Sequence, residues 1–336
     1  MSHQVTIEPS GHTYTVEAGE SLLDAGLRHG IALPYGCRNG ACGSCKGRLL
    51  AGEVAYQGQP PGLDAEMEAE GWALLCQAEA IEDLRIEIRE VGSVAEIPVK
   101  TLPARIQTME RLAGDVMAVW LRVPQTERLQ FLPGQYVDFL LPDGHRRSFS
   151  MANPPHEDEL LEFHIRHMPG GRFTDALFNG DLKEKDILRI EGPHGSFFWR
   201  EGGEGPAILV GGGTGIAPLK AILEHALAEE TARPLHLYWG VRTENDLYMV
   251  DTARGWAEAH ANVTFTPVLS EPGVADWSGR TGYVHEAVLA DFPDLAGCEV
   301  YSAGPPPMIA AMREAFPARG LDPERLYVDA FEPAGD

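Results

Sequence analysis

The sequence predicts a multidomain chain that combines α+β and α/β architecture, and three observations support this fold class. Its 336 residues are enough for two or three domains of ordinary size. The first ninety residues mix short strands and helices around a group of cysteines, and strands separated by Gly and Pro dominate from about residue 103. From about residue 206 strands and helices alternate, which is typical of a parallel sheet. We expect three domains, at 1–92, 103–202 and 203–336, and a linker at 93–102 between the first two.

The amino-acid composition argues against two classes of partner. Fifty Asp and Glu residues against 27 Lys and Arg give a formal net charge of −23, whereas nucleic-acid binding needs a basic surface. The sequence shows no secretory signal at its N-terminus and no run of about 18 apolar residues that could span a membrane. We expect a cytoplasmic monomer without a nucleic-acid or membrane partner, in a compartment where structural disulfides are disfavoured.

The patterns in the first domain predict strands at 4–9 and 12–18 and a helix at 21–30. A cysteine-rich loop follows, and it leads into a segment at 45–55 whose type the pattern does not fix. An acidic helix at 63–72 and a strand at 83–90 complete the domain. A turn at Ser10–Gly11 should join the first two strands. Ser21 is the expected N-cap of the first helix and Gly30 its expected C-cap.

Three cysteines lie within "GCRNGACGSC", and a fourth follows in "LLCQAEA". Four residues separate Cys37 from Cys42, two separate Cys42 from Cys45, and thirty separate Cys45 from Cys76. This spacing is the plant-type [2Fe–2S] signature. Structural zinc usually shows paired ligands, and a thioredoxin-like pair would leave Cys37 and Cys76 without a role. We expect these four thiolates to bind a [2Fe–2S] cluster, with loop glycines that let N–H groups point at sulfur.

Strands in the middle of the chain predict a small antiparallel barrel, at 103–112, 116–123, 135–141, 161–168 and 187–192. In "RRSFSMAN", the guanidinium of Arg147 can pair with a pyrophosphate, and the ring of Phe149 and the hydroxyl of Ser150 can contact a planar ring system. Because strand residues alternate between faces, these three side chains can line one ligand only if the strand bends or ends there.

A second motif, "MPGGRFTDAL", places two glycines before a helix that is expected to begin near Phe173–Thr174. Free N–H groups and the helix dipole at that point would suit a pyrophosphate. A glycine pair before a helix usually marks only a turn, so the order and spacing of the motifs carry the argument. The candidate cofactor-binding residues here and on the preceding strand are His164, Arg166, Gly170, Gly171 and Thr174.

The last third opens with "AILVGGGTGIAPLKAILEHAL", which predicts a strand, a Gly-rich turn and a helix. Such a turn places a dinucleotide phosphate at a helix N-terminus. Gly213, Thr214, Gly215 and Pro218 are the candidate residues. The proline departs from the G-x-G-x-x-G fingerprint of common dehydrogenases. Cys298, the fifth cysteine, is expected to be a small buried apolar residue.

Each of these regions resembles part of a known family. Residues 1–92, with "PYGCRNGACGSC", resemble the β-grasp fold of plant-type ferredoxins. The two barrel motifs, with "LPGQY", resemble the FAD-binding domain of the ferredoxin–NADP reductase superfamily. "GTGIAP", "HLYWGVRTENDLY" and "VYSAGPPPMI" resemble its nucleotide-binding domain, in which Gly304 and Pro305 border the nicotinamide. The order of the three domains is similar to that of single-chain reductase components of bacterial ring-hydroxylating oxygenases.

The resemblance implies a [2Fe–2S] cluster, FAD and NADH as cofactors. It implies an NADH-dependent oxidoreductase that passes electrons through FAD and the cluster, singly, to a partner protein, and no general acid or base is expected. The first expected partner is the terminal component of an aromatic-ring oxygenase or its ferredoxin. Two alternatives stay open, a reductase for a deoxysugar-forming sugar-3-dehydrase and a relay subunit without catalytic activity.

Three positions bear on how the nucleotide would be held. Ala303 stands where relatives often carry a cysteine, so no catalytic thiol is expected. NADP-specific relatives have a Ser-Arg pair where this chain has Ser270–Glu271, and a carboxylate there favours NADH, although Arg242 could still contact a phosphate. Phe331, near the C-terminus, is the candidate aromatic that covers the flavin, or else a core residue.

The first domain is acidic, with fourteen acids against six bases over residues 1–90. Its carboxylates gather in "LDAEMEAE". We hypothesise that this acidic helix steers a basic partner, while the cluster loop makes the close contact. A merely solvated acidic helix is the alternative.

Overall fold

The computed structural model describes residues 2–88, 90, 97–124, 126–273 and 277–332. The chain divides into two compact units, residues 1–98 with 195–197, and residues 99–194 with 198–336. Of the expected linker at 93–102, residues 93–96 lie outside the described residues. Residues 100–102 are not linker, because they pair with residues 190–192 as part of a strand. The three predicted domain limits stay predictions.

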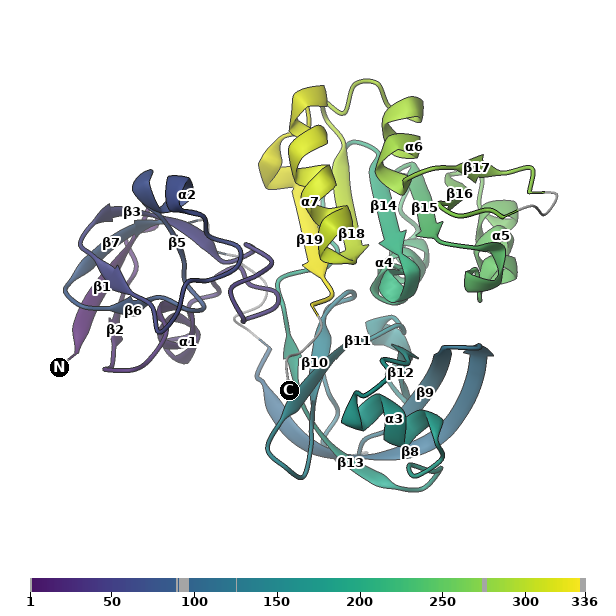
Figure 1. Ribbon diagram of the computed structural model, residues 1–336, viewed down its shortest axis with the longest axis horizontal. Coiled ribbons are helices and arrows are strands. Elements are labelled where there is room, and N and C mark those ends of the chain that lie inside the picture. Colours follow the sequence, from purple (N-terminus) through teal and green to yellow (C-terminus); the bar gives the residue numbers. More distant parts are fainter. Residues whose placement is uncertain (1, 89, 91–96, 125, 274–276, 333–336) are drawn as a thin grey trace. The chain divides into compact units, whose positions relative to one another are not determined.

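A mixed five-stranded sheet forms the first unit, in the order β2-β1-β7-β3-β5 (Figure 1). β1 runs parallel to β7, and the other pairs are antiparallel. Leu22 and Leu23 of α1 are fully buried in the core of this sheet. This is the β-grasp arrangement that the sequence predicts. The elements are β1 (His3–Glu8), β2 (Thr13–Val16), α1 (Leu22–Arg28), β3 (Lys46–Ala51), β4 (Val54–Ala55), α2 (Ala65–Ala69), β5 (Trp72–Leu74), β6 (Glu79–Ala80) and β7 (Leu84–Glu87).

Both helices of this unit differ from the prediction at their ends. Ser21 is the N-cap of α1, and its hydroxyl accepts from the N–H of Asp24 at 3.0 Å. The C-cap is His29, however, and Gly30 follows it with a left-handed φ of +76°. Helix α2 is shorter than expected because Asp64 caps its start and Gly71, with a φ of +87°, follows its end.

An antiparallel barrel opens the second unit, with the strand order β11-β10-β13-β8-β9-β12. A bridge between Met151 and Phe163 joins the two edges of this sheet. Phe139 and Phe163 pack edge to face at 5.1 Å inside the barrel, and Phe173 of α3 packs on Phe139 at 5.2 Å. The elements are β8 (Lys100–Ala113), β9 (Val116–Arg122), β10 (Tyr136–Leu140), β11 (Arg146–Ser150), η2 (Pro155–Glu157), β12 (Leu161–Arg166), α3 (Arg172–Phe178) and β13 (Ile187–His194).

A six-stranded parallel sheet completes the second unit, in the order β17-β16-β15-β14-β18-β19. From β14 the chain adds β15, β16 and β17 outward on one side of the sheet, and it then returns to add β18 and β19 on the other side. The topological switch point therefore lies between β14 and β18. Figure 1 shows helices flanking the sheet. The elements are β14 (Ala207–Gly212), η3 (Gly213–Gly215), α4 (Ile216–Ala228), β15 (Leu235–Val241), η4 (Glu244–Asp246), α5 (Val250–Ala259), β16 (Val263–Leu269), β17 (Arg280–Thr281), α6 (Val284–Asp291), β18 (Glu299–Gly304), α7 (Pro306–Ala315), η5 (Pro317–Arg319), η6 (Pro323–Arg325) and β19 (Leu326–Ala330).

Two further predictions concern burial and the membrane. Cys298 is 4 % exposed and belongs to the apolar core between the parallel sheet and its helices, as the sequence predicts. Within the part of the chain that the structure describes, every helix is too short or too polar to cross a bilayer.

Candidate functional site

The loop between α1 and β3 brings three of the four predicted cluster cysteines together. The N–H of Cys42 points at the sulfur of Cys37 at 3.3 Å, and the N–H of Cys37 points at the sulfur of Cys42 at 3.4 Å. The loop can close so tightly because Gly40 and Gly43 take left-handed φ values of +80° and +68°. Such N–H donors would stabilise negative charge on the sulfurs of a bound cluster.

Cys76 completes the set from the segment that follows β5. Its sulfur is hydrogen-bonded to that of Cys45, so the four thiols form two pairs. The hydrogen bond from Cys37 lowers the pKa of the Cys42 thiol to about 5, and Cys37, as the donor, has a raised pKa. Four convergent thiols with N–H donors around them fit a thiolate-ligated cluster, and metal binding would release their protons.

The predicted flavin residues Arg147, Phe149 and Ser150 all lie within β11, and Ser150 is its last residue. Whether these three side chains line one flavin stays a prediction. Arg147 is half-buried, and its Nη1 donates to the carbonyl of Arg146 at 2.9 Å. The ring of Phe149 packs on Phe139 at 5.0 Å, which places it toward the barrel core. The Ser150 hydroxyl donates to Asp329 of β19 at 3.0 Å.

The loop before α3 differs from the prediction in its hydrogen bonds. We expected free N–H groups at Gly170 and Gly171, but these groups donate to the Asp175 carboxylate at 3.1 Å and to the Met168 carbonyl at 2.9 Å. The Thr174 hydroxyl donates to the same Met168 carbonyl at 2.9 Å. The short loop folds back on itself and so uses these donors internally. The N–H groups in the first turn of α3 are the backbone donors that helix geometry leaves without an intrahelical partner here.

Arg166 offers the clearest fit for an anionic cofactor. Its Nε and Nη2 atoms are buried without a hydrogen-bond partner among the described residues, although Nε lies 3.3 Å from Asp115 in ion-pair range. A Cβ at Gly213 would lie 3.2 Å from its Nη1. A half-buried guanidinium with two buried nitrogen atoms that have spare N–H donors, beside a glycine turn, is suited to a phosphate group.

The nucleotide motifs meet at the switch point between β14 and β18. A Cβ at Gly215 would lie 1.9 Å from the carbonyl oxygen of Ala303, and one at Gly212 would lie 2.7 Å from Pro305. These residues must be glycine because the two turns approach so closely. Ligands of open parallel sheets bind at this crevice, outside the carboxyl ends of the strands. Gly304 and Pro305 are at its other wall, where β18 ends.

The two residues predicted to govern nucleotide choice are neighbours. Arg242 follows β15 and Glu271 follows β16, and the N–H of Glu271 donates to the carbonyl of Arg242 at 2.8 Å. Both residues are exposed. A cation and an anion therefore stand together at the carboxyl edge of the sheet.

The comparisons with known proteins identify a family for each part of the chain. Family models described as a 2Fe-2S iron-sulfur cluster binding domain, an oxidoreductase FAD-binding domain and an oxidoreductase NAD-binding domain match residues 5–80, 103–199 and 209–314. The CDP-6-deoxy-L-threo-D-glycero-4-hexulose-3-dehydrase reductase of Yersinia pestis is 38% identical over 99% of this chain and 100% of that protein. Reductase component 1 of terephthalate 1,2-dioxygenase from Comamonas is 33% identical over 98% of each chain.

Among solved structures, the Amycolatopsis cytochrome P450 reductase GcoB is 38% identical, with a TM-score of 0.80 over 99% of this chain and 100% of that chain. The chain belongs to the family of single-chain reductase components that join a [2Fe–2S] ferredoxin domain to FAD- and NAD-binding domains. This reductase is an NADH-dependent iron–sulfur flavoprotein oxidoreductase. A relay subunit that binds no nucleotide does not fit a chain with an NAD-binding domain.

Bound FAD would supply the chemistry that couples two-electron oxidation of NADH to one-electron reduction of the cluster. The protein's own residues bind and orient these groups. Phe331 follows β19, its N–H donates to the Gly304 carbonyl at 2.9 Å, and its side chain is half-buried. The structure thus brings Phe331 to the nucleotide crevice, and its role over the flavin stays a prediction.

Sequence reasoning missed a charged network between the barrel and the parallel sheet of the reductase. Lys220 of α4 places its Nζ 3.0 Å from Glu162 of β12 and 2.9 Å from Glu224. Burial raises the pKa of Glu162, but His164 and Lys220 outweigh this effect and lower it to about 2. The sequence feature that could have predicted this network is Lys220, a lysine in the otherwise apolar first half of α4.

The same network holds His164, one of the predicted cofactor residues. Its Nε2 lies 2.8 Å from Glu162, and its Nδ1 lies 3.1 Å from the hydroxyl of Tyr248. With the proton on Nε2 facing the carboxylate, Nδ1 accepts from Tyr248. Trp239 packs on Tyr248 at 5.2 Å and donates its indole N–H to the Gly213 carbonyl at 2.9 Å. The barrel strand is therefore linked through side chains to the Gly-rich turn.

Proposed function

We propose that Cys37, Cys42, Cys45 and Cys76 bind the [2Fe–2S] cluster of this reductase. The pairing of the four sulfurs and the N–H donors of the loop support this ligand set. For the flavin, the buried spare donors of Arg166 support a role at the pyrophosphate, and Ser150 lies where the strand ends. The switch-point crevice supports NADH binding over Gly213 and Gly215.

We further propose that the electron acceptor is the terminal component of an oxygenase that acts on an aromatic compound, or the ferredoxin of such a system. The observation that carries this proposal is likeness over the full chain to a terephthalate 1,2-dioxygenase reductase component, together with likeness to a cytochrome P450 reductase. The substrate would not touch this chain, because a reductase component delivers only electrons.

A second candidate is supported by an equally specific observation. The dehydrase reductase of Yersinia pestis is 38% identical over 99% of this chain and 100% of its own length. In that case the acceptor would be a sugar-3-dehydrase in deoxysugar formation. The two candidates share the same chemistry within this chain and differ only in the protein that receives the electrons.

The discriminating experiment uses the proteins encoded beside this reductase. Each candidate acceptor is purified and mixed with NADH and the reductase, and NADH consumption and product are measured together. The oxygenase proposal expects O₂ uptake and a hydroxylated or demethylated aromatic product in equal amounts with NADH. NADH consumption that depends on a CDP-sugar substrate, without O₂ uptake, would instead establish the dehydrase.

We also propose that the reductase works as a monomer in the cytoplasm. Its five cysteines form no disulfide among the described residues, which is usual for a reducing compartment. Light scattering of the cofactor-loaded protein should give a mass near 36.6 kDa, and a mass near twice that value would contradict the monomer.

A further inference from the structure

A side chain from the neighbouring strand holds the Gly-rich turn that follows β14. Trp239 of β15 is wholly buried, and its indole N–H donates to the Gly213 carbonyl at 2.9 Å. In the parallel pairing of the two strands Trp239 lies opposite Gly211, two residues before Gly213. A buried indole N–H without an acceptor would be costly, so this bond fixes both the indole and the carbonyl.

The bond acts on the residue that sets the course of the turn. Gly213 has a left-handed φ of +55°, a conformation that favours glycine. Its carbonyl also accepts from the N–H of Ile216, where α4 begins. One hydrogen bond to this carbonyl thus comes from within the turn, and Trp239 supplies the other from outside it. The N–H groups in the first turn of a helix have no intrahelical partner and suit a pyrophosphate.

Tyr248 supports the indole from the side. Its ring packs edge to face on Trp239 at 5.2 Å, and its hydroxyl lies 3.1 Å from Nδ1 of His164. Burial holds the pKa of Tyr248 well above its ordinary value, so the hydroxyl keeps its proton and donates to this nitrogen. Nε2 of His164 lies 2.8 Å from Glu162 on the same barrel strand. Trp239 therefore packs against a ring that β12 holds in place.

The helix that follows the turn is tied to the same barrel strand. Lys220 of α4 places its Nζ 3.0 Å from Glu162, the carboxylate that also binds His164. The turn is thus held on both sides. Trp239 binds its first residue, and Lys220 anchors the helix that continues from its last one.

We propose that Trp239 is a positioning residue for the pyridine nucleotide, which holds the Gly213 carbonyl so that the N–H groups of the turn face the pyrophosphate. The inference rests on the proposed nucleotide site at Gly213 and Gly215. Trp239 has no exposed surface with which to touch the nucleotide, so it acts through the turn. A phenylalanine would fill apolar space at this position but could not bind the carbonyl.

The test is Trp239→Phe in the cofactor-loaded reductase, with NAD⁺ binding to the oxidised protein measured by isothermal titration calorimetry. Loss of one buried hydrogen bond should raise the NAD⁺ dissociation constant about fivefold. In stopped-flow reduction of the flavin, the NADH concentration at half the limiting rate should rise by a similar factor. The limiting rate itself should stay within about twofold of the wild type. A residue that only stabilises the fold would not produce this split.

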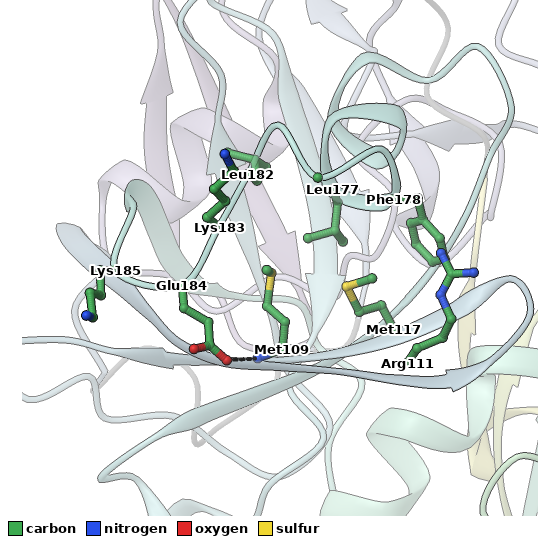
Figure 2. A pocket seen from close by; sticks show the side chains of 10 residues that line it. Met109, Arg111, Met117, Leu177, Phe178, Leu182, Lys183, Glu184 and Lys185 are labelled. Atoms are coloured by element: carbon green, nitrogen blue, oxygen red, sulfur yellow. Dashed lines mark hydrogen bonds between the residues drawn. The ribbon is translucent and has the colours of Figure 1, made fainter.

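Tyr238→Phe is the matched control, because this neighbour of Trp239 points to the other face of β15 and also loses a hydrogen bond, from its hydroxyl to Asp291 at 2.8 Å. Met109→Leu, in the wall of a hollow on the barrel (Figure 2), is the control for altered barrel packing, since this swap nearly keeps the side-chain volume. Both controls should bind NAD⁺ as the wild type does. If Trp239→Phe does not fold, benzothienylalanine at position 239 keeps the shape of the indole without its N–H and should show the same loss.

Wild-type NAD⁺ affinity in Trp239→Phe or in the benzothienylalanine protein would overturn the proposal. An equal loss in Tyr238→Phe would also overturn it, because the effect would then come from a general loosening of β15. Thr214→Glu tests the underlying site separately, since a carboxylate at this half-buried position should repel the pyrophosphate and weaken NAD⁺ binding about tenfold. Normal binding by Thr214→Glu would show that the proposed nucleotide site is wrong. Weakened binding by Thr214→Glu alone would show that the site is right and that Trp239 does not position it.

Discussion

The backbone N–H of Glu271 donates a hydrogen bond of 2.8 Å to the carbonyl of Arg242. β15 and β16 are parallel neighbours, so the residues that follow them come to the same edge of the sheet. The carboxylate and the guanidinium have opposite effects on a 2′-phosphate. The position of Glu271 beside Arg242 therefore makes it the first residue to change in a test of nucleotide choice.

Glu271→Arg should raise the use of NADPH relative to NADH by about tenfold. The change replaces repulsion by a charge-assisted bond, and like charges in an exposed site interact by roughly 1 kcal/mol. The measurement is the ratio of kcat/KM for the two nucleotides in flavin reduction. Glu229→Arg, an exposed acid at the C-terminal end of α4, is the matched control. An unchanged ratio would place the discriminating residues elsewhere.

Cys76→Ser should remove or severely weaken the [2Fe–2S] cluster while FAD stays bound, because different domains hold the two cofactors. Iron and sulfide content should fall, and NADH should still reduce the flavin. Cys298→Ala changes a cysteine in the core of the parallel sheet and should keep the wild-type cluster content. A Cys76→Ser protein with full iron and sulfide would show that the fourth ligand is another residue.

Lys220→Met should destabilise the second unit by about 3 kcal/mol near pH 8, because it leaves two largely buried carboxylates without their cation. In the wild type, the pKa of Glu162 is about 2 against an ordinary value of 4.5. Its ionised form thus stabilises the fold above pH 4.5, and this contribution is lost as the pH falls through about 2.

In the variant, burial without Lys220 should raise the pKa values of Glu162 and Glu224, so stability should fall as the pH rises. The difference from wild type should therefore shrink between pH 8 and pH 5, as measured by urea unfolding followed by circular dichroism. Lys183→Met, at an exposed lysine, is the control for charge loss. A difference that does not vary with pH would show that the network is not electrostatic.

Neutralising Glu66, Glu68 and Glu70 together should slow electron delivery to the partner and mimic high salt. The three acids are exposed on and beside α2, and long-range steering weakens as the Debye length falls to about 10 Å at 0.1 M salt. NADH reduction of the flavin should respond much less. Substitution of Glu17, Glu53 and Glu82 by Gln, at three other exposed acids of the domain, is the charge-matched control. If the rate of electron delivery to the partner changes neither with salt nor with the α2 substitutions, the acidic helix is only a solvated surface and does not steer the partner.

Local features of this protein followed from the sequence because their causes are local. Cysteine spacing, the Ser21 cap, the alternation of strands in the barrel and the glycine turn after β14 depend on residues close together in the chain. The structure departs from the sequence prediction at a helix cap and at a glycine loop. His29 rather than Gly30 caps α1, and the N–H groups of Gly170 and Gly171 are taken by Asp175 and Met168.

Relationships between distant residues were decided only by the tertiary structure. The bond from Ser150 to Asp329 joins residues 179 positions apart, and His164 reaches Tyr248 across 84. No sequence period encodes such pairs, since they depend on the order of strands in each sheet and on how barrel and sheet pack. The sequence by itself determined which cofactors this reductase can hold. The packing of strands and helices decided which distant side chains lie side by side, because contacts between distant segments form only when their apolar faces are buried together.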